Sequence, residues 1–144
     1  MTVDDFWKLM DRVDRRTLKQ GEGYDADAVE PLIDALLPLP RVELESFAEH
    51  LSNALYLLDG RKFCDAAGDF GDDGFLYARC FVVAMGREIF ERAQGDPSMM
   101  PKSLNEWCEP LLYAPGEAWR RKTGEDWDCS PSVSYETGSN KSLW

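Results

Sequence analysis

Four aspartates lie close together near the middle of the sequence, at Asp65, Asp69, Asp72 and Asp73. Carboxylate oxygens are the ligands that hard cations prefer, and the glycines among these residues would permit tight turns. However, the spacing does not match the loop of an EF-hand. Negative charge stabilises the N-terminus of a helix. We therefore expect Asp72 or Asp73 to cap a helix rather than to bind a metal.

A candidate binding site lies at the start of that helix and comprises Asp72, Asp73, Tyr77 and Arg79. Carboxylates beside an arginine and a tyrosine can perform acid–base chemistry when they are buried. Arg79 lies beside the apolar stripe of the helix, where a guanidinium needs a carboxylate or an anionic ligand. We expect an internal ion pair with Asp73 or Glu109, and an anionic ligand is the alternative.

No catalytic residue is predicted elsewhere in the chain. The only histidine, His50, would have to serve any Ser–His or Cys–His hydrolase, and no G-x-S-x-G pattern accompanies it. We therefore expect a surface histidine. The cysteines match no zinc-site spacing and are predicted to be free thiols: Cys64, Cys80, Cys108 and Cys129.

Aromatic residues crowd one quarter of the chain, and they raise the question of a stacking platform for a base or cofactor. No G-x-G-x-x-G or Walker A phosphate loop accompanies them. The four residues are Trp107, Tyr113, Trp119 and Trp127. We therefore predict no cofactor, and we expect Trp107 and Trp119 to pack in the core.

Helical periodicity dominates the sequence that must position these residues. Apolar residues recur at steps of three and four, and strand-like alternation over five or more residues is absent. Thr2 and Asp5 have the spacing of a capping box. We expect helices over residues 4–19, 27–37, 42–58 and about 72–94, a short or kinked helix from residue 103, and a last helix ending near residue 124.

The segment over about 72–94 is apolar most of the way round near its start, which is typical of a buried helix. The sequence thus predicts an all-α fold of five or six helices packed around this central helix. Gly86 falls inside it, so we expect close backbone packing there. Residues 61–71 are expected to form a loop.

Composition does not change abruptly along the chain, so we predict one helical domain over residues 1–127. Residues 128–144 show no helical period and are rich in Ser, Pro, Gly and Asn. We expect them to form an irregular tail, laid along the domain by Val133, Tyr135 and Trp144.

The charge balance excludes several function classes. The 144 residues include 16 Lys and Arg against 27 Asp and Glu, a net charge of −11. Phosphate backbones and anionic membranes repel such a surface, so neither is an expected partner. The N-terminus lacks a secretory signal, and the longest apolar run covers five residues. We therefore expect a cytoplasmic protein, and the oligomeric state stays open.

Several short motifs resemble, in their order and spacing, a bacterial family catalogued as domain of unknown function 4240. They are Phe6-Trp7, the run 71–79 followed by Gly86-Arg87-Glu88, the run 109–115, Thr123-Gly124-Glu125 and the run 135–140. The resemblance covers nearly the whole chain and implies a small, mostly helical cytosolic domain with no assigned activity. Many members have Ser-Asp-Asp where this chain has Gly71-Asp72-Asp73.

Two function classes follow from these observations. The first is a non-enzymatic protein-binding or regulatory module, because a strongly acidic helical surface suits a basic protein partner through electrostatic steering. The alternative is a small enzyme or ligand-binding domain whose site lies at the start of the central helix.

Overall fold

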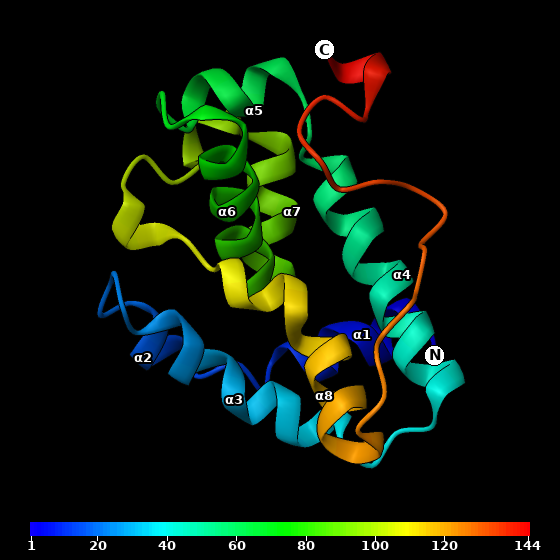
Figure 1. Ribbon diagram of the computed structural model, residues 1–144. Helices are drawn as coiled ribbons and strands as arrows, with labels where there is room; N and C mark the ends of the chain where they lie inside the picture. Colours follow the sequence, from blue (N-terminus) through cyan, green and yellow to red (C-terminus); the bar gives the residue numbers. More distant parts are fainter.

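The computed structural model describes residues 1–144 and confirms the prediction of an all-α fold (Figure 1). Eight α-helices follow one another along the chain: α1 (Val3–Met10), α2 (Arg15–Leu18), α3 (Asp25–Leu36), α4 (Arg41–Leu57), α5 (Arg61–Ala66), α6 (Gly71–Ala84), α7 (Arg87–Gly95) and α8 (Ala114–Thr123). Four short 3-10 helices join them: η1 (Pro97–Met99), η2 (Leu104–Glu106), η3 (Glu109–Tyr113) and η4 (Lys141–Leu143).

Helix α6 is the most deeply buried element, as its apolar circumference predicts. Ten of its 14 residues are buried. It contacts α4, α7 and η3, while α3 and α8 pack against each other at the opposite end of the molecule (Figure 1). One apolar core of 33 buried residues joins these elements. No helix has both the length and the apolar character that crossing a membrane requires.

The prediction of one continuous central helix over about 72–94 is wrong. Helix α6 ends at Ala84 and α7 begins at Arg87, because Gly86 between them adopts a φ of +101°. That conformation is strained for a residue with a side chain. A Cβ on Gly86 would also lie 2.6 Å from the guanidinium of Arg15. The glycine therefore permits a turn of the chain, and it does not lie within a helix.

Other boundaries also differ from the predictions, so the number of helices is eight and not five or six. The predicted helix over residues 4–19 is divided into α1 and α2, and the expected loop over 61–71 contains α5. The capping box at Thr2 and Asp5 is confirmed by two reciprocal hydrogen bonds of 2.9 and 3.1 Å. Local capping chemistry thus fixes the start of α1.

Residues 128–144 contain only η4 and run beside α4 (Figure 1). Polar contacts hold this C-terminal segment to α4 and to the turn that follows it. Ser132 bonds the carboxylate of Glu49 through both its amide and its hydroxyl group. The side-chain amide of Asn140 donates to the carbonyl of Tyr56 at 2.9 Å.

Candidate functional site

Arg79 is fully buried, and its guanidinium faces the C-terminal segment. Its Nη1 donates to the carbonyls of Leu55 and Tyr135 at 3.0 and 2.9 Å. Its Nη2 donates to the hydroxyl of Thr137 at 3.1 Å, and its charge lies 4.6 Å from the ring centroid of Phe75. The predicted ion pair with Asp73 or Glu109 is therefore wrong, since neutral oxygens take the place of a carboxylate.

The buried charge that balances Arg79 belongs to Asp59, which is also inaccessible to solvent. Burial lowers the pKa of Arg79, and attraction to Asp59 opposes this effect. The carboxylate of Asp59 accepts hydrogen bonds from the amides of Gly138 and Asn140 at 3.0 and 2.9 Å, and from the indole of Trp144 at 2.8 Å. Two buried opposite charges thus anchor the C-terminal segment.

Nothing in the sequence around Asp59 indicates a buried carboxylate. It occurs in an Asp59-Gly60 pair just after α4, which is an ordinary signal for the end of a helix. Its donors come from residues about 80 positions further along the chain. No local pattern indicates such partners, so the sequence carries no signal of this role.

Asp72 and Asp73 are exposed in the first turn of α6, where their negative charge interacts favourably with the positive end of the helix dipole. The predicted side-chain cap is not formed, because the N-terminal capping position is Phe70. Asp72 contacts the C-terminal segment through its backbone, because its carbonyl accepts a hydrogen bond of 2.7 Å from the hydroxyl of Thr137. No group of three or more His, Cys, Asp or Glu residues is placed to hold a metal ion.

Tyr77 is half-buried and contacts the ring of Trp107, with 5.5 Å between the ring centroids. Interaction with the carboxylate of Glu109 raises the pKa of Tyr77 to about 12. Arg79 instead contacts α4 and the C-terminal segment. The structure therefore does not bring the four predicted site residues together into one cavity.

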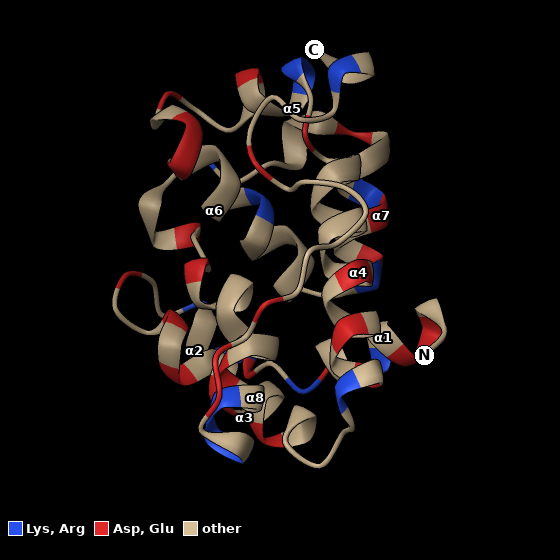
Figure 2. Ribbon diagram, turned by 45° about the vertical axis from the view of Figure 1, so that its right-hand side comes forward, with Lys and Arg blue, Asp and Glu red and all other residues tan.

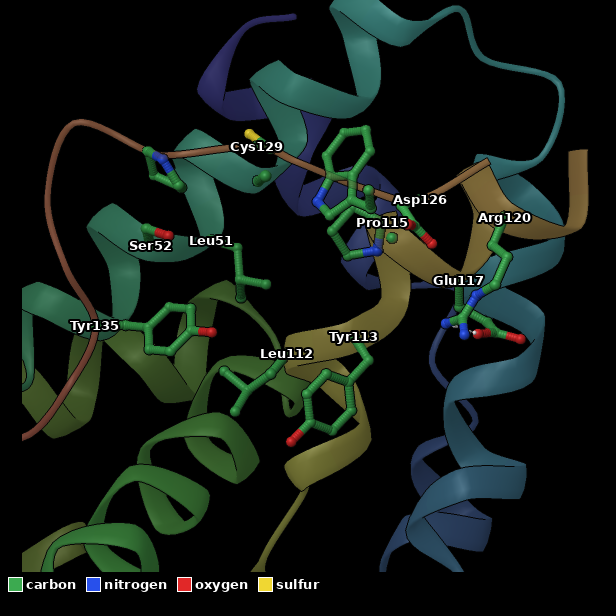
Figure 3. Close-up of a pocket in the computed structure, with 14 residues that line it drawn as sticks. Leu51, Ser52, Leu112, Tyr113, Pro115, Glu117, Arg120, Asp126, Cys129 and Tyr135 are labelled. Carbon is green, nitrogen blue, oxygen red and sulfur yellow. Dashed lines mark hydrogen bonds and ion pairs between the residues drawn. The ribbon is translucent and has the colours of Figure 1, made fainter. Parts of the chain in front are cut away.

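A cleft of about 560 Å³ opens elsewhere, between α4, α8 and the segment 126–135 (Figure 3). Half of its lining residues are hydrophobic. In Figure 3 the side chain of Leu112 lies between the phenol rings of Tyr113 and Tyr135. The lining residues are Ala48, Leu51, Ser52, Leu112, Tyr113, Pro115, Gly116, Glu117, Arg120, Asp126, Trp127, Cys129, Pro131 and Tyr135.

The three aromatic residues of the lining, Tyr113, Trp127 and Tyr135, stand out in the sequence, but the sequence does not predict a cleft. The signal was the crowding of aromatic residues in this part of the chain. The wall that carries Tyr135 comes from the predicted irregular tail, which has no periodicity from which a position could be inferred. Only the packing of that tail against α4 and α8 creates the cleft.

The charged groups of the cleft are unequally paired. Glu117 accepts hydrogen bonds from Arg120 at 2.7 Å and from Arg121 at 3.0 Å, so its charge is balanced. Asp126 is exposed and forms no ion pair or side-chain hydrogen bond. Tyr113 donates to the carboxylate of Glu109 at 3.0 Å. The cleft thus carries one carboxylate without a cation.

The weakly acidic groups of the cleft stay protonated at neutral pH. Burial raises the pKa of Cys129, and the nearby carboxylate of Glu45 raises it further. Burial also raises the pKa of Tyr113 and of Tyr135, and Glu109 adds to the first of these shifts. A thiol with a raised pKa is a poor nucleophile, because the thiolate is the reactive form.

Arg41 lies beside the cleft and shows how this region binds a cation. Its guanidinium carbon lies 4.9 Å from the ring centroid of Trp119 and 5.2 Å from that of Trp127. It also pairs with Glu45 at 2.8 Å and with Asp128. Aromatic faces and carboxylates together stabilise a positive charge at this position.

Comparison with known proteins places the chain in a family. No curated protein and no solved structure matches the chain significantly. A family described as "Protein of unknown function (DUF4240)" matches residues 1–121, which leaves the wall of the cleft over residues 126–135 outside the matched region. Because the match covers most of its length, the chain belongs to the DUF4240 family.

Proposed function

We propose that this protein is a non-enzymatic protein-binding module that receives its partner at the cleft between α4, α8 and the segment 126–135. The observation that carries the proposal is the cleft itself. Its volume of about 560 Å³ falls within the range of small-molecule sites, roughly 300–1,000 Å³, so the cleft is large enough to enclose a side chain of a partner. Its mixture of aliphatic, aromatic and polar side chains is also typical of such sites.

The charge of the molecule supports a basic partner. The net charge is −11, and the internal ion pairs leave this acidic excess unchanged because each of them joins one cation to one carboxylate. Figure 2 shows acidic residues over the whole height of the molecule, on helices and on connecting segments. A basic partner is therefore attracted at long range, and the cleft supplies the contact at short range. The proposal includes a cytoplasmic location, where buried thiols stay reduced.

The alternative of an enzyme or ligand site at the start of α6 is not favoured by a specific observation. Tyr77 and Arg79 contact different parts of the molecule, and Asp72 and Asp73 are exposed. The cleft is therefore the better candidate for a binding site.

A photo-crosslinking experiment tests the proposal. A photoreactive phenylalanine analogue at Tyr113, which is 55% exposed at the cleft, should capture a protein partner in a cell lysate of set salt concentration. The same analogue at Met99, which is exposed outside the cleft, serves as the control. A product specific to Tyr113 that weakens as salt is raised supports the proposal. Identical products at both positions, or none at Tyr113, would contradict it.

A further inference from the structure

The walls of the cleft suit a side chain that has an apolar stem. Leu51, Leu112 and Pro115 provide aliphatic contacts, and Figure 3 shows all three directed toward the space between the helices and the C-terminal segment. The side chains of lysine and arginine bury such stems along apolar surfaces and leave the charged group beyond them.

Aromatic rings in the same cleft suit a positive charge at the end of that stem. Tyr113, Trp127 and Tyr135 all line it. The faces of tyrosine and tryptophan rings attract ammonium and guanidinium groups. The hydroxyl of Tyr135 forms no hydrogen bond within the protein, so it is free to accept one from a bound cation.

The charge of the cleft excludes an anion and leaves room for a cation. Arg120 is the only basic residue of the lining, and the carboxylate of Glu117 lies 2.7 Å from it. Asp126 has no such partner. Burial is the main cause of the raised pKa of Cys129, and the carboxylates of Glu45 and Glu49 raise it further against the opposing charge of Arg41.

The molecule already contains one example of this recognition. Arg41 stacks on Trp119 and Trp127 and pairs with carboxylates on either side. Trp127 belongs both to this arrangement and to the lining of the cleft. The cleft therefore adjoins a position where rings and carboxylates stabilise a cation, and its other two rings, those of Tyr113 and Tyr135, contact no cation within the protein.

We infer that the cleft takes a lysine or arginine side chain of the partner protein, with its stem against Leu112, the rings of Tyr113 and Tyr135 beside its charged group and Asp126 as the counter-charge. The inference rests on the proposed function, since it names the chemistry of the partner at the same site. It makes the contact specific, because overall acidity attracts a basic protein but does not select where that protein binds.

The test uses two capped amino acids that differ in charge and hardly in shape. Acetyl-arginine methylamide and acetyl-citrulline methylamide are titrated to millimolar concentration while the backbone amide signals of the protein are recorded by NMR. The arginine probe should shift the signals of Tyr113, Gly116 and Cys129, and it should bind at least about five-fold more tightly than the citrulline probe. Equal binding of the two probes, or shifts confined to other residues, would overturn the inference.

Two variants locate the contact. Asp126→Asn and Tyr113→Leu both change exposed side chains outside the core, so folding is not at risk. Asp126→Asn should weaken the arginine probe about three-fold or more and leave the citrulline probe unchanged. Asp65→Asn removes the same charge from an exposed site outside the cleft and is the control. Equal losses in Asp126→Asn and Asp65→Asn would show that overall charge, and not the cleft, attracts the probe. Tyr113→Leu removes the aromatic ring and should weaken the arginine probe about three-fold or more, so unchanged binding would contradict the role of the ring face.

The outcomes distinguish this inference from the proposed function. If Tyr113 crosslinks a specific partner but the two probes bind equally, the cleft is a binding site and the basic side chain is refuted. If the probes discriminate as expected but no partner is captured, the inference about the cation stands and the proposed protein partner fails.

Discussion

Replacement of Arg79 by methionine tests the account of the buried charges most directly. Methionine keeps an unbranched apolar stem and removes the guanidinium. The carbonyl of Leu55 would still accept a bond from the amide of Leu58, and Thr137 would still donate to the carbonyl of Asp72. The carbonyl of Tyr135 would lose its donor, which costs about 1–3 kcal/mol for a buried group.

The larger part of the expected loss comes from Asp59, which would stay buried without its balancing charge. Removal of one partner from a buried pair of charges typically costs about 3–5 kcal/mol. Asp59 keeps its three hydrogen-bond donors and forms no direct ion pair with Arg79, so we take this range to include the loss at Tyr135. We therefore expect Arg79→Met to lower the free energy of unfolding by about 3–5 kcal/mol in all, out of a total of roughly 5–15 kcal/mol.

Urea unfolding at neutral pH measures this change. Arg16→Met, at an exposed arginine without an ion pair, is the matched control and should change stability by less than about 0.5 kcal/mol. Asp59→Asn and the double variant complete a cycle, and their losses should be non-additive by more than about 0.5 kcal/mol. An Arg79→Met protein at least as stable as the parent would refute the reasoning, since the guanidinium would then contribute nothing to holding the C-terminal segment.

Three further predictions concern other parts of the molecule. Gly86→Ala should destabilise the protein by about 1–3 kcal/mol in urea unfolding, because its φ of +101° is strained for alanine, whereas Gly95→Ala should not destabilise it because no atom lies within 4 Å of the added Cβ. Burial raises the pKa of Cys108 to about 12 and that of Cys80 well above its ordinary value, so iodoacetamide at pH 8 should label both cysteines only after unfolding. Rapid labelling of the native protein, detected by mass spectrometry, would contradict the burial of these thiols. The pKa of Tyr77 is raised to about 12 in the folded protein, so the unfolded chain ionises this phenol at a lower pH, and the stability that Tyr77 contributes below about pH 10 is lost as the pH rises toward 12. In Tyr77→Phe the thermal midpoint of unfolding should therefore fall less steeply between pH 10 and 12 than in the parent, and an unchanged slope would count against the raised pKa.

The sequence by itself determined the helical class and several helix boundaries. Helical periodicity and capping depend on residues three or four positions apart, so a short window contains the whole signal. The predicted helix over 42–58 agrees with α4 (Arg41–Leu57) to within one residue at each end. The reciprocal bonds of Thr2 and Asp5 follow from the same local spacing.

The tertiary structure alone decided how the polar and aromatic residues are used. A glycine in the sequence can lie in a helix or in a turn, so the sequence does not decide the conformation of Gly86. In the structure Gly86 forms a turn against the guanidinium of Arg15, which lies 71 residues earlier in the chain. The partners of Arg79 lie 24, 56 and 58 residues away, beyond any local pattern. The cleft combines α4, α8 and a segment without periodicity, so its lining is set by packing between distant parts of the chain, for which a single sequence contains no spacing to measure.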